Sequence, residues 1–227
     1  RQHHVEVIPE IDTPGHSRAL IQLMEKSTKR DRKLIKQISD QDSELDQNDR
    51  RTLPFVKSLL QEYLGLLSPG QHVGIGGDEY SIDHAATQPN SVRYVNGLNH
   101  YLNRHHFTAT LWNDQVMKAD LNHLDNNILI IYWSYDGQTA DPLLVNHHRQ
   151  VRASLPDFNQ AGFQTINANF SYLYLITSPK MFLPANVDFW QKDLQAHWTH
   201  QIWDNWQHQF PAKSTLNIGS ALSIWGD

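Results

Sequence analysis

Six short apolar runs recur along the chain, and segments with a helical pattern lie between them. The runs are rich in Val, Ile and Leu and span residues 4–12, 72–80, 107–114, 127–137, 163–175 and 214–227. Two intervening segments, 53–67 and 92–106, place their apolar residues on one helical face. Strands that alternate with helices pair in parallel, because each helix returns the chain to the start of the next strand. We therefore expect an α/β fold with a parallel sheet.

Polar or aromatic residues follow each predicted strand. These clusters are Glu10–Asp12, Asp78–Glu79, Trp112–Asp114, Trp133, Tyr172–Tyr174 and Trp225. In a closed barrel the carboxyl ends of all strands meet at one face, where the active site lies. A doubly wound open sheet is the alternative, but it gathers its ligand residues at one switch point rather than after every strand. The pattern favours a TIM-type barrel.

The segment 25–51 is densely charged and follows the first predicted strand. We expect a solvated loop there with a short helix. No internal repeat or low-complexity linker interrupts the chain. We therefore expect residues 1–227 to form a single domain.

Charge and composition exclude several classes of function. The formal net charge of -5 comes without a basic stripe, which argues against a nucleic-acid partner. No Gly-rich phosphate-binding loop, no cysteine and no membrane-length apolar run occurs in the sequence. The fourteen histidines lack the helical spacing with Glu that marks a zinc protease, so we expect no metal and no cofactor.

Aromatic residues are the most informative part of the composition. The chain has seven tryptophans and eight tyrosines. Flat aromatic rings pack against the C–H faces of sugars as well as in cores. A carbohydrate ligand is therefore compatible with this composition, although core packing is the more common role for any single ring.

The acid pair Asp78–Glu79 ends an apolar run and follows Gly76 and Gly77. Adjacent carboxylates repel each other, so a purely structural role for the pair gains little. We expect the pair to do chemistry. We also expect the two glycines to allow a close backbone approach where side chains would block a ligand.

Six motifs together make the chain resemble glycoside hydrolase family 20, the β-N-acetylhexosaminidases. They are "PEIDTPGH" (9–16), "GGDEY" (76–80), "LWND" (111–114), "YWSYDG" (132–137), "YLY" (172–174) and "ALSIWGD" (221–227). Each motif alone is weak evidence. All six occur in order at compatible spacing over essentially the whole chain.

The resemblance implies an eight-stranded (β/α)8 barrel of which this chain covers roughly strands three to eight. On this view the domain is truncated: the first two strands, an arginine near the first strand that holds sugar hydroxyls, and much of the final helix are missing. Position 74 departs from the family pattern, because Gly74 stands where His is common. A barrel that lacks two strands exposes sheet edges, so we expect this chain to associate with itself.

The resemblance also implies catalysis in which the substrate's own 2-acetamido oxygen attacks the anomeric carbon. Glu79 matches the residue that protonates the leaving oxygen and later deprotonates water. Asp78 matches the carboxylate that accepts the amide N–H, and Tyr174 matches the hydroxyl that orients the attacking oxygen.

Further matches concern substrate binding. Trp112, Trp133 and Trp225 match the tryptophans that wall the acetamido pocket. Asp141 and Asp227 match acids that bond sugar hydroxyls, with Asp227 standing where Glu is usual. Asp12 and His16 match rim residues, for which a loop-fixing hydrogen bond is an equal alternative. Asp114 is left open between a structural and a functional role.

We therefore expect a β-N-acetylglucosaminidase-type enzyme that removes terminal N-acetylhexosamine from glycans or poly-N-acetylglucosamine without a cofactor. The resemblance favours an extracellular or cell-surface location. The alternative is an inactive or carbohydrate-binding barrel fragment, which would have no need of the acid Glu79. A family 18-like chitinase would need an acid series spaced DxxDxDxE, which the chain lacks.

Overall fold

Six parallel strands form the main sheet of the protein. The computed structural model describes residues 6–81, 87–133, 151–176, 182–203 and 214–225. The strands are β1 (Glu10–Thr13), β2 (His72–Gly76), β3 (Thr108–Trp112), β4 (Leu129–Tyr132), β5 (Thr165–Asn167) and β7 (Asn217–Ser220). Each overlaps one of the six predicted apolar runs, and only β1 extends beyond its run, by one residue, so all six predicted strands are confirmed.

The order of strands in this sheet follows the order of the chain. The sequence of neighbours is β1-β2-β3-β4-β5-β7, and every pairing is parallel. A doubly wound sheet reverses its winding at a switch point, and no reversal occurs here. The carboxyl ends of neighbouring strands therefore lie along one edge, as in the wall of a (β/α) barrel.

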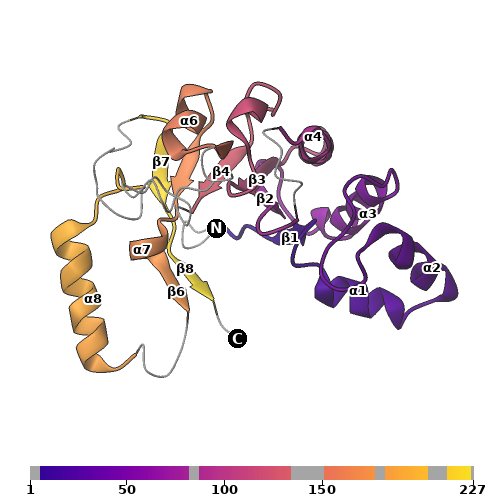
Figure 1. Cartoon of the computed structure of the whole chain (residues 1–227), viewed down its shortest axis with the longest axis horizontal. Coiled ribbons are helices and arrows are strands. Elements are labelled where there is room, and N and C mark those ends of the chain that lie inside the picture. The colour runs from indigo at the N-terminus through magenta and orange to yellow at the C-terminus, as the bar shows by residue number, and fades with distance from the viewer. Residues whose placement is uncertain (1–5, 82–86, 134–150, 177–181, 204–213, 226–227) are drawn as a thin grey trace.

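Helices connect the strands (Figure 1). Their bounds are α1 (Arg18–Glu25), α2 (Lys29–Ile38), α3 (Thr52–Leu64), α4 (Pro89–Arg104), α6 (Leu155–Gln160), α7 (Phe170–Leu173) and α8 (Pro184–His197), with a 3-10 turn η1 (Lys118–Asp120). The patterns at 53–67 and 92–106 thus correspond to α3 and α4. Leu60 of α3 and Leu98 of α4 are buried in the core, as the helical periodicity predicts.

The charged segment 25–51 is more structured than the sequence indicates. Helix α2 begins with a capping box in which Thr28 and Asp31 each accept from the other's backbone N–H. Ile35 and Ile38 are fully buried, and Leu45 after the helix is buried as well. The prediction of a short helix is right, but this helix contributes to the core rather than lying on a solvated loop.

Two further strands form a separate two-stranded sheet. Strand β6 (Tyr174–Ile176) pairs in parallel with β8 (Ser223–Trp225), and Tyr174 lies opposite Ser223. The sequence predicts one strand in each of the runs 163–175 and 214–227, whereas the structure has two in each. Helix α7 separates β5 from β6. The second pairing brings the last two predicted motifs side by side.

The chain turns sharply after β2 because Gly76 and Gly77 have positive φ values of 74° and 93°. A Cβ at position 76 would lie 2.1 Å from Oδ1 of Asp12 and 2.6 Å from the backbone nitrogen of Thr13. A Cβ at position 77 would lie 2.4 Å from Cδ1 of Leu111. The close approach predicted for these glycines is real, but the space beside them holds the protein's own groups rather than a ligand.

Strands β1 and β7 are the outer strands of the main sheet within the described part of the chain. Val7 and Ile8, just before β1, are 70% and 40% exposed.

In the described ranges, no helix combines the length and apolar character needed to cross a membrane.

We predict that Gly76→Ala destabilises the fold more than Gly70→Ala. Gly70 also has a positive φ, 89°, but nothing lies within 4 Å of its missing Cβ, so this control carries only the left-handed penalty of about 1–2 kcal/mol. At position 76 the methyl group also collides with the backbone of β1, which adds about 1–3 kcal/mol. Urea denaturation measures both losses, and equal losses would contradict this account of the turn.

Candidate active site

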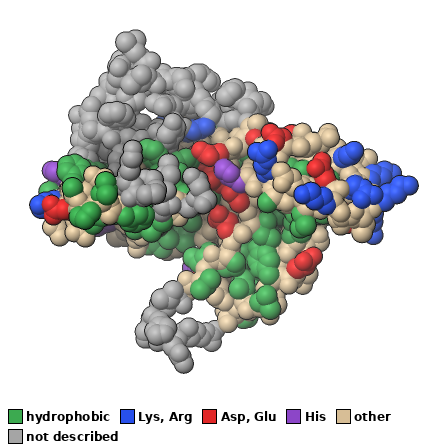
Figure 2. All heavy atoms as spheres, turned by 90° about the horizontal axis from the view of Figure 1, so that it is seen from below, with side chains coloured by type: hydrophobic (Ala, Val, Ile, Leu, Met, Phe, Trp, Pro, Cys, Tyr) green, Lys and Arg blue, Asp and Glu red, His purple; other side chains and the backbone are tan. Residues whose placement is uncertain are grey.

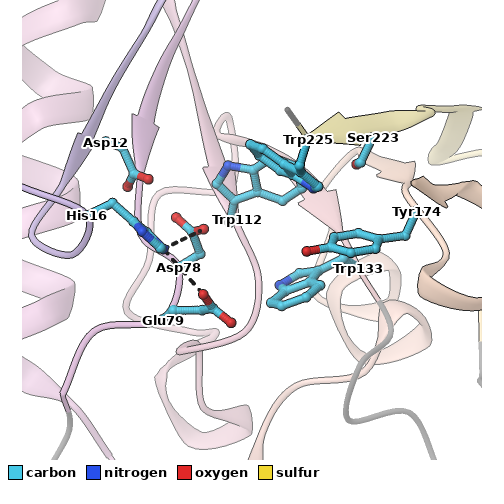
Figure 3. Close-up of a pocket in the computed structure, with 9 residues that line it drawn as sticks. All are labelled: Asp12, His16, Asp78, Glu79, Trp112, Trp133, Tyr174, Ser223 and Trp225. Carbon is cyan, nitrogen blue, oxygen red and sulfur yellow. Dashed lines mark ion pairs between the residues drawn. The ribbon is translucent and has the colours of Figure 1, made fainter. Parts of the chain in front are cut away.

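A cavity of 170 Å³ opens at the carboxyl ends of the strands (Figure 3). Its lining residues are Asp12, His16, Asp78, Glu79, Trp112, Trp133, Tyr174, Ser223 and Trp225. Eight of these nine are candidate residues from the sequence. The other two candidates, Asp141 and Asp227, lie outside the described residues.

Acidic groups form one side of this cavity. Asp12 comes from β1 and His16 from the turn after it, while Asp78 and Glu79 follow β2. The Nε2 atom of His16 lies 3.5 Å from Oδ2 of Asp78 and 3.4 Å from Oε2 of Glu79. The Asp78 side chain is only 14% exposed, whereas that of Glu79 is 56% exposed. The two adjacent acids therefore occupy different environments, one inside the cavity and one at its mouth.

The carboxyl groups of Asp12 and Asp78 lie beside each other, with one oxygen of each within 4.8 Å of the other. Burial raises the pKa of both groups. Charge repulsion from neighbouring acids, Asp114 among them, raises both pKa values further. One oxygen of each, Oδ1, is buried and has no donor among the described residues. A shared proton is the arrangement that two carboxyls at such a distance favour.

Asp12, His16 and Asp78 also place one potential ligand atom each within 4.8 Å of the others, a spacing that could hold a metal ion. The sequence predicts no metal.

Charged side chains are unevenly distributed over the surface. Figure 2 shows acidic side chains and a histidine near the centre of one face, while Lys and Arg gather at the end that carries α1 and α2.

Aromatic rings form the other side of the cavity. Trp133 stacks on Tyr174, with ring centroids 5.9 Å apart and planes 21° from parallel. The ring centroid of Trp225 lies 6.2 Å from that of Trp112 and 6.3 Å from that of Tyr174, and both ring pairs are tilted. Trp225 is 44% exposed. All three predicted wall tryptophans therefore face one space, together with Tyr174, rather than lying in separate parts of the core.

The hydroxyl of Tyr174 stays protonated in this setting. Burial raises its pKa, and the nearby charges of Glu79 and Asp78 raise it further. A protonated phenol donates a hydrogen bond. Tyr174 can therefore donate to an oxygen of a ligand that lies between the rings and the acids.

Three consecutive residues after β3 hold the neighbouring loops. Asn113 Oδ1 accepts from the backbone N–H of Trp133 at 2.7 Å. Asp114 accepts from the backbone N–H of Glu79 at 2.8 Å and from the indole N–H of Trp133 at 3.0 Å. Gln115 donates to the backbone carbonyl of Tyr80 at 2.8 Å. The sequence analysis left Asp114 open, and its contacts lie directly behind the cavity.

The departure at position 74 has a structural counterpart. A Cβ on Gly74 would lie 2.5 Å from Oε2 of Glu10. The other oxygen of Glu10 accepts from the indole N–H of Trp112 at 3.4 Å. The absence of a side chain at 74 thus leaves room for Glu10 beside a cavity tryptophan.

Sequence reasoning missed Ser223, the ninth lining residue, and Phe170, whose ring lies 4.8 Å from that of Tyr174. A signal for Ser223 was present, since Ser223 and Trp225 are two apart on one strand and so share a face. Phe170 lies in α7, which no pattern in the sequence indicated.

We predict that the free energy of unfolding falls as pH rises from about 5 to about 8. The raised pKa values of Asp12 and Asp78 mean that the folded chain binds more protons than the unfolded chain above about pH 4. Their contribution is thus present at low pH and is lost as pH rises through the folded-state values. Asp78→Asn should flatten this slope in urea denaturation series. An unchanged slope in Asp78→Asn would contradict a raised pKa of Asp78 in the folded chain.

Comparison with known proteins identifies relatives with this arrangement. Residues 1–227 match the sequence model described as "Glycosyl hydrolase family 20, catalytic domain". The structure of dispersin B is similar with a TM-score of 0.82 and 33% identity, covering 97% of this chain and 64% of that chain. A lacto-N-biosidase of Bifidobacterium bifidum is 24% identical over an alignment of 195 residues that covers 75% of this chain and 16% of that protein.

A structure of the pneumococcal exo-β-D-N-acetylglucosaminidase StrH, 21% identical, has a TM-score of 0.69 over 100% of this chain and 54% of its own, and supports the fold. The chain therefore spans less than two thirds of the length of these relatives. The family match covers the whole chain, and the sheet order is that of a partial (β/α)8 barrel. The chain belongs to glycosyl hydrolase family 20.

Proposed function

We propose that this protein is a β-N-acetylhexosaminidase, of the β-N-acetylglucosaminidase type, that acts by substrate-assisted retaining catalysis. One observation carries the proposal: Asp78, Glu79 and Tyr174 face a single cavity that three tryptophans also line. Family membership supports it. We further propose that residues 1–227 belong to one catalytic barrel domain.

In the first step, the carbonyl oxygen of the substrate's 2-acetamido group attacks the anomeric carbon, and the glycosidic C–O bond breaks. Glu79 donates a proton to the leaving oxygen. Its position at the mouth, 56% exposed, suits contact with a leaving group that extends toward solvent. Asp78, inside the cavity, accepts the acetamido N–H, and the one negative charge that the Asp12–Asp78 pair keeps while it shares a proton balances the positive charge of the oxazolinium.

In the second step, water attacks the anomeric carbon and Glu79 takes the proton from that water. The C–O bond to the acetamido oxygen breaks, and the acetamide is restored. Two displacements at one carbon retain its configuration. Tyr174 donates to the acetamido oxygen and holds it in line for the attack.

The aromatic wall has a separate part in this proposal. Trp112, Trp133 and Trp225 surround the acetamido methyl group and keep out water that would open the oxazolinium early. Asp141 and Asp227 remain proposed partners for sugar hydroxyls. His16 contacts both acids of the pair, and Asp12 lies beside Asp78.

The proposed substrates are glycans or polysaccharides that end in N-acetylhexosamine. A carbohydrate-binding fragment without activity is the alternative, because the chain spans 64% of the dispersin B chain. Turnover of a chromogenic N-acetylglucosaminide separates the two, since a binding module needs no proton donor.

We predict that Glu79→Gln and Asp78→Asn lose activity in different ways. Glu79→Gln removes the proton donor, so substrates with poor leaving groups should lose on the order of 10²–10⁴ in rate, and activated aryl glycosides should lose less. Asp78→Asn keeps the donor but removes the balancing charge, so all leaving groups should suffer alike. Steady-state kinetics over a series of aryl and alkyl N-acetylglucosaminides measures both patterns.

A matched control for this pair is Asp42→Asn, whose side chain is 74% exposed and lies outside the cavity. It should retain the parent's dependence on leaving group. If Glu79→Gln lost equal activity on every leaving group, Glu79 would not be the proton donor.

We also propose that the 227-residue chain associates with itself through the outer edge of β1, an end strand of the sheet in the described part of the chain. The edge of a sheet presents unpaired N–H and C=O groups, and the exposed apolar residues Val7 and Ile8 lie beside this one. Light scattering should show a mass that increases with concentration, and Ile8→Lys should reduce it. A monodisperse monomer at all concentrations would refute self-association.

A further inference from the structure

Asp114 lies two residues after the end of β3, and it contacts two residues that line the cavity, Glu79 and Trp133. Its side chain does not line the cavity itself, and the residue is only 7% exposed. Its Oδ2 atom accepts from the backbone N–H of Glu79 at 2.8 Å, and Oδ1 accepts from the indole N–H of Trp133 at 3.0 Å. One buried carboxylate therefore joins the loop after β2 to the residue after β4.

The contact with Glu79 is made where the backbone needs support. Glu79 has a φ of 47°, in the left-handed region that non-glycine residues rarely adopt. Such a conformation persists only where surrounding contacts hold it. A hydrogen bond from a backbone N–H to a buried carboxylate is a strong contact of this kind. Asp114 thus holds the backbone that aims the Glu79 side chain.

The contact with Trp133 fixes the ring rather than the backbone. Asn113 already accepts from the backbone N–H of Trp133 at 2.7 Å. The indole N–H is a single donor at one edge of the ring, so a bond to Asp114 selects one orientation. In that orientation Trp133 stacks on Tyr174. The effect of Asp114 therefore extends through Trp133 to the Tyr174 ring.

Both contacts require the carboxyl oxygens of Asp114 to act as acceptors. Burial raises the pKa of this carboxyl, while the two hydrogen bonds and the nearby cation Arg152 oppose that rise. The residue is thus held by donors on both oxygens in a dry site. An amide at this position could accept at only one of them, because its nitrogen is a donor.

We propose that Asp114 is a positioning residue that sets the aim of the proton donor Glu79 and the orientation of Trp133 together. This inference rests on the proposed function and adds a residue to it. Asp114 touches neither the cavity nor the reacting atoms, so it acts through the two residues it holds. Small displacements of a catalytic group can cost about 10²-fold in rate.

The test compares Asp114→Asn with Asp120→Asn in the full 227-residue chain. Asp120 is a matched control, since it is 3% exposed and also accepts from a backbone N–H, that of Gln88 at 2.6 Å, but lies outside the active-site cavity. Asp114→Asn should lower kcat on the order of 10²-fold for an alkyl N-acetylglucosaminide and much less for an activated aryl one. Asp120→Asn should retain the parent's ratio between the two substrates.

A second readout does not depend on turnover. The indole N–H resonance of Trp133, identified by its loss in Trp133→Phe, should shift in Asp114→Asn and stay in place in Asp120→Asn. Binding of a thiazoline mimic of the oxazolinium should weaken at least about tenfold in Asp114→Asn only, because the ring no longer holds its orientation. If the parent bound this mimic but hydrolysed nothing, the proposed function would fail while these binding measurements still tested Asp114.

Three results would overturn the proposal. One is an Asp114→Asn variant whose kinetics match those of Asp120→Asn on both substrates. Another is an equal loss on both substrates that parallels the loss of folded protein, which is the pattern of a structural residue. The third is a Trp133 indole resonance that does not move.

A double variant, Asp114→Asn/Trp133→Phe, tests the link between the two residues. Its increase in activation free energy, measured from kcat/KM, should be smaller than the sum of the increases in the two single variants, because the two residues share one contact.

Discussion

Parallel pairing of consecutive strands is the constraint on which the rest of this structure depends. Because β1, β2, β3 and β4 are neighbours in chain order, the residues that follow each strand meet the residues that follow the next. Asp12, Asp78, Trp112 and Trp133 reach one cavity from four different strand ends. The pairing of β6 with β8 adds Tyr174 and Trp225 by the same principle. A slip in any of these registers would separate groups that line one cavity.

The cavity concentrates negative charge in a dry place, which costs stability. Two carboxyls, Asp12 and Asp78, share this space, and burial raises the pKa of both. Gly76 permits the arrangement, because a Cβ there would collide with Asp12. Buried carboxyls that gain little for the fold are typical of functional sites. The left-handed backbone of Glu79 is also unfavourable. The hydrogen bond that the Glu79 N–H donates to the buried carboxylate of Asp114 stabilises it.

The sequence predicted those features that have a simple period or a fixed place after a strand. Each of the six apolar runs contributes one strand to the main sheet, and eight candidate residues line one cavity, because strand ends determine where such residues lie. Features that depend on tertiary packing were missed. Helix α2 buries Ile35 and Ile38 although its segment is highly charged, and β6 and β8 exist only because they pair with each other.

Glycine and aspartate show the same limit in single residues. The sequence indicated that Gly76 allows close approach, but only the fold shows that Asp12 and the β1 backbone fill the space. Asp114 could not be assigned from "LWND", because its two donors come from residues 35 positions before and 19 positions after it. Contacts over such distances leave no local pattern in a sequence.

The central claim is that the substrate supplies the nucleophile, and a comparison of two substrates tests it most directly. An aryl β-N-acetylglucosaminide and the matching aryl β-glucoside differ only in the 2-acetamido group. Under this account kcat/KM for the glucoside should be lower by many orders of magnitude, and a fluorosugar should trap no covalent adduct on the protein. Comparable cleavage of the two, or an adduct on Asp78, would show that the protein uses a nucleophile of its own.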